Sequence, residues 1–186
     1  MPRIELPPSS DYSLSKVAYQ TYAPEAGAAA SAFSLTVYEK CLLSLREMEG
    51  ARYRTAQING CILCSNTRAA RDLAGHITRN GGSLADSPLA RGPAPDEPFY
   101  EAVPDWATSP LFSERERIAI ELAERMGERP HSMHGDDAFW DKVHAHFSDR
   151  EIVDMTLAIA SWIALGRVVH TLELDGVCMP TFADAA

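Results

Sequence analysis

Two cysteines separated by two residues, Cys61 and Cys64, carry the clearest chemical signal in the sequence. At the start of a helix, this spacing lets the two sulfur atoms meet in a small disulfide ring without moving the backbone far. Unsatisfied backbone N–H groups and the positive end of the helix dipole lie nearby, and both favour thiolate over thiol. The pattern therefore predicts a dithiol that cycles between reduced and oxidised forms.

Two charged residues are placed to act on these thiols. Glu49 interrupts an apolar helical stripe that starts at Tyr38 and repeats at spacings of three and four residues. A partly buried carboxyl close to a dithiol is a candidate proton acceptor that later returns the proton. Arg68 follows Cys64 by four residues, so we expect its guanidinium on the same helix face, where it would stabilise the thiolate.

Other interpretations of the same residues stay open. A C-x-x-C pair also forms half of many zinc sites, although the usual second pair is missing here. Three histidines stand at no spacing that recommends them as further ligands, namely His76, His131 and His134. Considered alone, Glu49 is more often a helix-edge residue that reaches water, and Arg68 a solvated or ion-paired side chain. Cys41 and Cys178 are interpreted as small hydrophobic residues or incidental thiols.

The elements that must position these residues are helices. Apolar spacing and turn residues predict helices over 35–59, 61–80, 114–126, 137–147 and 149–175. Capping-box patterns at Ser113–Glu116 and Ser148–Glu151 mark two of the helix starts. No convincing pair of strands and no fixed internal period is found, so the expected class is all-α.

Residues 83–110 separate the dithiol region from the later helices. They hold six of the twelve prolines, at 88, 93, 95, 98, 104 and 110, and therefore predict a long ordered loop or lid. Three aromatic residues, Phe99, Tyr100 and Trp106, indicate that this segment packs onto the rest of the chain.

Composition favours one globular domain over residues 1–186, with residues 1–30 as an N-terminal extension. The 186 residues are 46% hydrophobic and 23% charged, a balance typical of a single compact core. The net charge of −9, concentrated in the C-terminal half, argues against nucleic acid as a partner. No stretch near the N-terminus resembles a signal peptide and no run of about 18 apolar residues occurs, so we expect a cytoplasmic protein without a membrane span.

Taken together, the site residues resemble the carboxymuconolactone decarboxylase-like superfamily, specifically its alkylhydroperoxidase D-like branch. That branch carries a Glu, eleven intervening residues that end in a Gln-x-Asn-Gly-like turn, and then C-x-x-C. The residues in register are Glu49, Gln57, Asn59, Gly60, Cys61 and Cys64. Stretches 112–117 and 147–153 look like the starts of two later family helices. The resemblance covers about residues 38–174, with 83–110 as an insertion.

This resemblance implies an alkylhydroperoxidase D-like helical bundle that assembles into a homo-oligomer, a trimer or hexamer, with the dithiol in a pocket near a subunit interface. It implies a thiol-dependent peroxidase in which Cys64 attacks a small hydroperoxide and Cys61 resolves the sulfenic acid. Glu49 would manage protons, and a dithiol reductant of unknown identity would reopen the disulfide. We expect neither a cofactor nor a bound metal.

One departure from the family leaves two rival functions open. Arg68 stands where the family has a proton-relay histidine, and a guanidinium does not shuttle protons at neutral pH. The first rival is a decarboxylase of small lactone acids, although such members generally lack C-x-x-C. The second is a non-catalytic, oligomeric redox sensor whose dithiol only reports oxidation.

Overall fold

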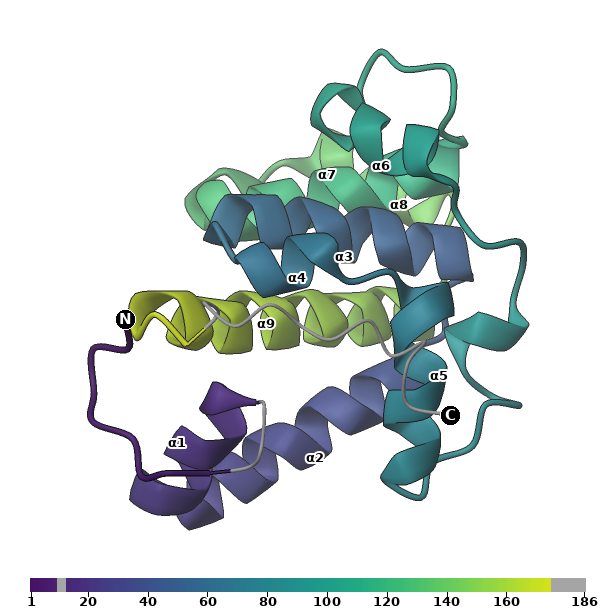
Figure 1. The fold of residues 1–186 in the computed structure, drawn as a ribbon. Coiled ribbons are helices and arrows are strands. Elements are labelled where there is room, and N and C mark those ends of the chain that lie inside the picture. The colour runs from purple at the N-terminus through teal and green to yellow at the C-terminus, as the bar shows by residue number, and fades with distance from the viewer. Residues whose placement is uncertain (10–12, 175–186) are drawn as a thin grey trace.

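The computed structural model describes residues 1–9 and 13–174, and this part of the chain is helical, with no strand (Figure 1). The α-helices, in chain order, are α1 (Leu14–Tyr22), α2 (Pro24–Lys40), α3 (Leu45–Asn59), α4 (Ile62–Asn66), α5 (Ala69–Arg79), α6 (Glu97–Ala102), α7 (Glu114–Glu128), α8 (Asp137–His144) and α9 (Asp149–Thr171). Short 3₁₀ turns, η1 (Pro88–Ala90), η2 (Val103–Asp105) and η3 (Pro130–Met133), lie between them. The predicted all-α class is confirmed.

Three helices, α3, α7 and α9, form the centre of the bundle, and α3 packs against both of the others. Each begins with a capping box, in which a serine side chain accepts from the backbone three residues later and a glutamate side chain accepts from the serine backbone. The pairs are Ser44 with Glu47, Ser113 with Glu116, and Ser148 with Glu151.

Arginines link these three helix starts to one another. Arg115 of α7 donates to Glu47 of α3 at 2.6 Å and to Glu151 of α9 at 2.9 Å. Arg46 of α3 donates to Glu116 of α7 at 2.5 Å. The glutamates that cap the helices therefore also join them, at the end of α3 away from the dithiol.

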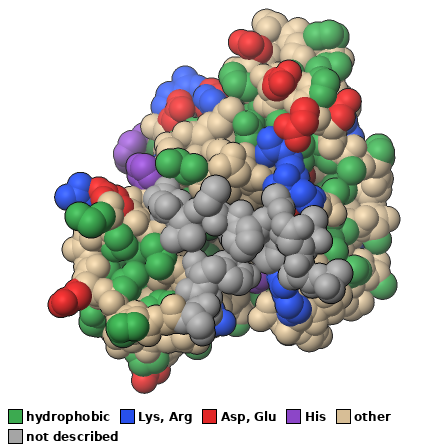
Figure 2. Space-filling model, viewed as in Figure 1, with side chains coloured by type: hydrophobic (Ala, Val, Ile, Leu, Met, Phe, Trp, Pro, Cys, Tyr) green, Lys and Arg blue, Asp and Glu red, His purple; other side chains and the backbone are tan. Residues whose placement is uncertain are grey.

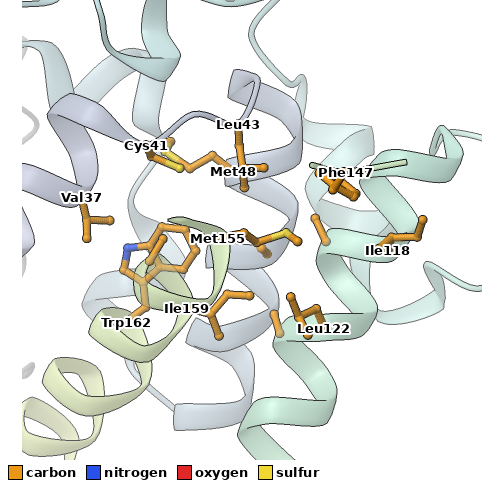
Figure 3. Packing of buried hydrophobic residues seen from close by; sticks show 14 of the residues in the cluster. Val37, Cys41, Leu43, Met48, Ile118, Leu122, Phe147, Met155, Ile159 and Trp162 are labelled. Atoms are coloured by element: carbon orange, nitrogen blue, oxygen red, sulfur yellow. The ribbon is translucent and has the colours of Figure 1, made fainter. Parts of the chain in front are cut away.

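The main hydrophobic core fills the space between these helices and the C-terminal part of α2 (Figure 3). The side chains that meet there include Val37, Cys41, Leu43, Met48, Ile118, Leu122, Phe147, Met155, Ile159 and Trp162. Most are fully buried, so the core holds α3 and α9 in fixed register.

The predicted helix over 35–59 is wrong in one respect, because it is two helices. α2 ends at Lys40 and α3 starts after Ser44. Side chains from distant segments form hydrogen bonds with the backbone groups at the break. The backbone N–H of Leu42 donates to Asp154 at 2.7 Å, and Arg91 donates to the carbonyl oxygens of Cys41 and Leu43. These long-range partners pair the backbone N–H and C=O groups that a continuous helix would otherwise pair.

The predicted helix over 61–80 is also divided. α4 ends at Asn66, and Thr67 and Arg68 are extended before α5 begins. The backbone N–H of Arg68 donates to Asp72 at 2.8 Å, which caps α5. With only five residues, α4 has a smaller dipole than the long helix that the sequence analysis expected to bear the cysteines.

Residues 83–110 are more ordered than a simple loop or lid, because they contain η1, α6 and η2. Phe99 and Tyr100 are buried, and Trp106 packs against the same small cluster, which confirms that the segment packs onto the chain. The helices predicted over 137–147 and 149–175 are present as α8 and α9. Residue 175, where the second prediction ended, lies outside the described residues, as does Cys178.

The N-terminal residues pack onto the bundle through α1 and α2. The backbone N–H of Arg3 donates to the carbonyl oxygen of Leu172 at 3.0 Å, beside the end of α9. Figure 2 shows hydrophobic side chains at the surface over α1 and α2, and Tyr22 and Phe33 are among the exposed ones.

By length and composition, α9 is the one described helix that would suffice to cross a membrane. It lies instead in the middle of the bundle and packs against α2, α3 and α7. Its inward face carries Met155, Ile159 and Trp162, which are buried in the core. This is the position of a core helix.

Candidate active site

The two cysteines lie together at the start of α4. Their sulfur atoms are 2.6 Å apart and both residues are in the thiol form, with the thiol of Cys61 placed to donate to the sulfur of Cys64. The backbone N–H of Cys64 also donates to the Cys61 sulfur at 3.4 Å. Cys61 is fully buried, whereas Cys64 is partly exposed. An outside molecule therefore reaches the sulfur of Cys64 more readily than that of Cys61.

The turn before the cysteines is anchored to α9. Gly60 adopts a left-handed conformation with φ of 66°, which ends α3 and turns the chain toward α4. The side chain of Asn59 donates to the carbonyl oxygen of Trp162 at 2.9 Å and accepts from Arg167 at 3.1 Å. The Asn-Gly pair thus fixes where the dithiol segment begins relative to the core.

Glu49 faces inward with no exposed surface, so the helix-edge interpretation is wrong. Its carboxylate accepts from three residues. Arg52 donates through Nε to Oε1 and through Nη2 to Oε2, the latter at 3.2 Å. The backbone N–H of Ala69 and the hydroxyl of Tyr100 donate to Oε2 at 3.0 Å and 2.5 Å. The carboxylate therefore joins α3 to the start of α5 and to α6.

Arg52 is a site residue that the sequence analysis missed. Besides pairing with Glu49, it donates to the carbonyl oxygens of Cys64 at 2.7 Å and Thr67 at 2.8 Å. Burial opposes its charge, but the charge and hydrogen bond of Glu49, together with nearby Tyr38 and Cys64, outweigh burial and raise the pKa of Arg52. A basic residue three positions after a buried acid on one helix was the signal available in the sequence.

Arg68 does not make the predicted contact with the Cys64 sulfur. Its Nε and Nη2 donate to the two oxygens of Glu97, both at 2.9 Å, and its Nη1 donates to the carbonyl oxygens of Ser65 and Thr67. The guanidinium lies 4.0 Å above the ring of Tyr100. It points toward α6 because a carboxylate and an aromatic face are available there.

Two tyrosines lie close to the charged groups of the site. Burial raises the pKa of Tyr38, and the nearby charges of Cys64 and Glu49 raise it further while Arg52 lowers it. Burial likewise raises the pKa of Tyr100, and the adjacent Glu49 adds to the effect. Both phenols therefore stay protonated at neutral pH, and the Tyr100 hydroxyl donates to Glu49.

The histidines considered as metal ligands are not gathered at the dithiol. His76 packs edge-on against the ring of Tyr38, and burial followed by the charge of Arg79 lowers its pKa, so it is neutral at neutral pH. His131 and His134 are exposed, in and just after η3. Within residues 1–9 and 13–174, no group of three or more His, Cys, Asp or Glu side chains is arranged to hold a metal ion.

The geometry gives a defined chemical capability. A partly exposed thiol with a buried partner thiol in contact can be oxidised and then close a disulfide with little backbone movement. The buried ion pair of Glu49 and Arg52 is connected to this segment by the hydrogen bond from Arg52 to the carbonyl oxygen of Cys64, and it supplies a carboxylate and a fixed cation.

Comparison with known proteins by sequence gives a relative that matches part of the chain. No family model matches the chain. A curated relative, the uncharacterised protein YnjA of Escherichia coli K12, is 41% identical over 79 residues, which is 41% of this chain and 42% of that protein. The match thus spans about two fifths of the length of the relative.

A solved structure from Agrobacterium tumefaciens is similar over a much larger part of the chain. It superimposes with a TM-score of 0.61 and 25% sequence identity, covering 85% of this chain and 94% of that one. It is described as a protein of unknown function and as a candidate antioxidant defence protein AhpD. The fold of the present chain is therefore AhpD-like and all-helical.

Proposed function

We propose that this protein is a thiol peroxidase of the alkylhydroperoxidase D-like branch, which reduces small hydroperoxides through the pair Cys61 and Cys64. The observation that carries the proposal is the contact between a buried and a partly exposed sulfur, 2.6 Å apart, beside the Glu49–Arg52 ion pair. The description of the Agrobacterium relative as an antioxidant defence protein supports the same class of activity.

The reaction proceeds in two steps at sulfur and one reductive step. The Cys64 thiolate attacks one oxygen of ROOH, breaks the O–O bond and becomes sulfenic acid, while the leaving alkoxide takes a proton and departs as ROH. The Cys61 thiol then attacks the Cys64 sulfur, forms the disulfide and releases water. An external dithiol supplies two electrons and two protons, restores both thiols and becomes a disulfide itself.

The charged residues have separate roles in proton transfer and in charge stabilisation. Glu49 takes the thiol proton and later returns it, because its Oε1 accepts one hydrogen bond and keeps a second lone pair. Arg52 holds the carbonyl oxygen of Cys64 and offsets the negative charge that develops beside it. Arg68 supports the site through Glu97 and Tyr100, in place of the thiolate contact expected from the sequence.

We further propose a cytoplasmic homo-oligomer, a trimer or hexamer. Apolar side chains at the surface of α2 and α9 support assembly, since large apolar residues are exposed there at Phe33, Val153, Leu157 and Val168. The physiological electron donor is then a dithiol protein or small dithiol that reaches the partly exposed Cys64.

The test is peptide mapping of the reduced protein after one equivalent of hydroperoxide. Wild type is expected to lose two hydrogens between Cys61 and Cys64, and Cys61→Ser to retain one added oxygen on Cys64. Cys64→Ser should abolish peroxide consumption with a dithiol donor. Two reduced cysteines after treatment would overturn the proposal. If the two cysteines are oxidised once but no dithiol donor supports repeated turnover, the redox-sensor alternative is favoured.

A further inference from the structure

The proline-rich segment 83–110 reaches the centre of the site through one side chain. Tyr100, in α6, is only 2% exposed, and its hydroxyl donates to Glu49 over 2.5 Å. α6 is connected to α3 by this bond and by the Phe99 ring, over which the guanidinium of Arg46 lies at 4.5 Å. The segment therefore supplies a hydrogen-bond donor to a carboxylate that is 51 residues earlier in the chain.

Tyr100 is fixed in place from several sides. Its ring contacts Phe99 and Tyr53 edge-on, at centroid distances of 5.5 Å and 5.2 Å. The guanidinium of Arg68 covers the ring at 4.0 Å and is itself held by both oxygens of Glu97, three residues before Tyr100. Arg68 also donates to the carbonyl oxygens of Ser65, in α4, and of Thr67, just after it. One side chain thus connects α6 to the end of α4.

We propose that Tyr100 is a positioning residue for the Glu49 carboxylate, held there by the Arg68–Glu97 ion pair, so that segment 83–110 belongs to the active site. This inference rests on the proposed function, in which Glu49 exchanges protons with the dithiol. A hydroxyl that only donates stabilises the charged carboxylate through Oε2, while Oε1 accepts one hydrogen bond, from Arg52, and keeps a lone pair for the proton. Arg68 then acts through the position of Tyr100, and no proton passes through its guanidinium.

The experiment compares two tyrosine variants. Tyr100→Phe removes the hydroxyl bound to Glu49 and keeps the ring under Arg68. Tyr53→Phe is the matched control, because its ring belongs to the same cluster and its hydroxyl makes no hydrogen bond to Glu49. The readout is the rate of Cys64 oxidation by hydrogen peroxide in a single turnover, followed from pH 5 to pH 9. In Tyr100→Phe the acid limb should move upward by about one pH unit, since the carboxylate loses a donor.

A second pair of variants tests the ion pair. Glu97→Gln removes the charge that holds Arg68, while Glu101→Gln removes an exposed charge from the same helix. We expect Glu97→Gln to shift the acid limb in the same direction as Tyr100→Phe but by less, and Glu101→Gln to leave it in place. A Tyr100→Phe profile that coincides with that of Tyr53→Phe would overturn the inference.

Failure of the proposed function gives a different result. In that case wild-type Cys64 does not react with peroxide at any pH. The inference is then tested by infrared spectroscopy. The spectrum of each variant is compared with that of the same variant carrying Glu49→Gln, and the difference isolates the Glu49 carboxylate band. Proton uptake by Glu49 that starts at higher pH in Tyr100→Phe than in Tyr53→Phe supports it, and equal onset overturns it.

Discussion

Arg52 donates from Nη1 to the carbonyl oxygen of Cys64 over 2.7 Å, so a buried cation of α3 holds the backbone of the residue proposed as the nucleophile. The same guanidinium binds Glu49 and the carbonyl oxygen of Thr67. α4 is therefore held in place by a side chain of α3 as well as by its own short ladder of hydrogen bonds.

Replacing Arg52 by methionine should destabilise the fold and release the dithiol segment. The change leaves Glu49 as a buried charge without its cation, which costs about 3 kcal/mol of unfolding free energy in comparable cases. Arg54→Met is the control, because Arg54 pairs with Glu124 nearer the surface and should cost about 1 kcal/mol or less. Urea unfolding measures both values. Equal losses would contradict the role assigned to Arg52.

Cys41 should be chemically silent in the folded protein. It is 1% exposed, and burial, assisted by the nearby Asp154, raises the pKa of its thiol to about 12. At pH 8, iodoacetamide is expected to label Cys64 and leave Cys41 unmodified, whereas in urea both cysteines react. Peptide masses before and after denaturation give the answer. Labelling of Cys41 at the rate of Cys64 without denaturant would refute the expectation.

Because of the capping glutamate Glu151, the free energy of unfolding should decrease in acid. The backbone N–H of Ser148, the Ser148 hydroxyl and Arg115 together lower the pKa of Glu151 to about 2, against an ordinary value of 4.5. Its stabilising contribution is complete above pH 4.5 and disappears as the pH falls from 4.5 toward 2. Glu151→Gln should therefore cost about 1 kcal/mol at pH 7, discounted for partial exposure, and almost nothing at pH 2. Denaturant titrations at both pH values test the difference, and a cost independent of pH would refute it.

Gly166 lies where α9 passes the Asn59 side chain, and an added methyl group should not fit. A Cβ at Gly166 would be 2.5 Å from Nδ2 of Asn59, which holds the turn before the dithiol. Gly166→Ala should lower the free energy of unfolding by about 1–3 kcal/mol. Gly75→Ala in α5 is the control, since the nearest atom there is the flexible end of Arg79 at 3.6 Å. That variant should be neutral or more stable by about 0.5–1 kcal/mol. Thermal unfolding of both variants separates these outcomes.

The parts of the fold that the sequence predicts well are those with local signals. The capping boxes at Ser113 and Ser148 place the starts of α7 and α9 correctly, because their partners are three residues away. The breaks within 35–59 and 61–80 depend on distant partners, such as Asp154 and Arg91 for the first and Arg52 for the second. Periodicity within one segment does not contain that information.

The same distinction applies to the candidate site. The contact between Cys61 and Cys64 and the inward direction of Glu49 follow from spacing along the chain. The direction of Arg68 does not, because its partners Glu97 and Tyr100 belong to a segment about 30 residues later. A proline-rich stretch has no hydrophobic periodicity that would reveal which of its side chains points toward the site.

The attachment of α4 by side chains also bears on local opening. The three long helices share a core and their starts are linked by ion pairs, so we expect their amide hydrogens to exchange only when most of the bundle unfolds. α4 has five residues, none of them buried, and its carbonyl oxygens accept side-chain hydrogen bonds from Arg52, Arg68 and Arg71. Once these bonds break, we expect the dithiol segment to open at a lower free energy than the bundle, so that a reductant reaches the buried sulfur of Cys61 while the long helices stay folded.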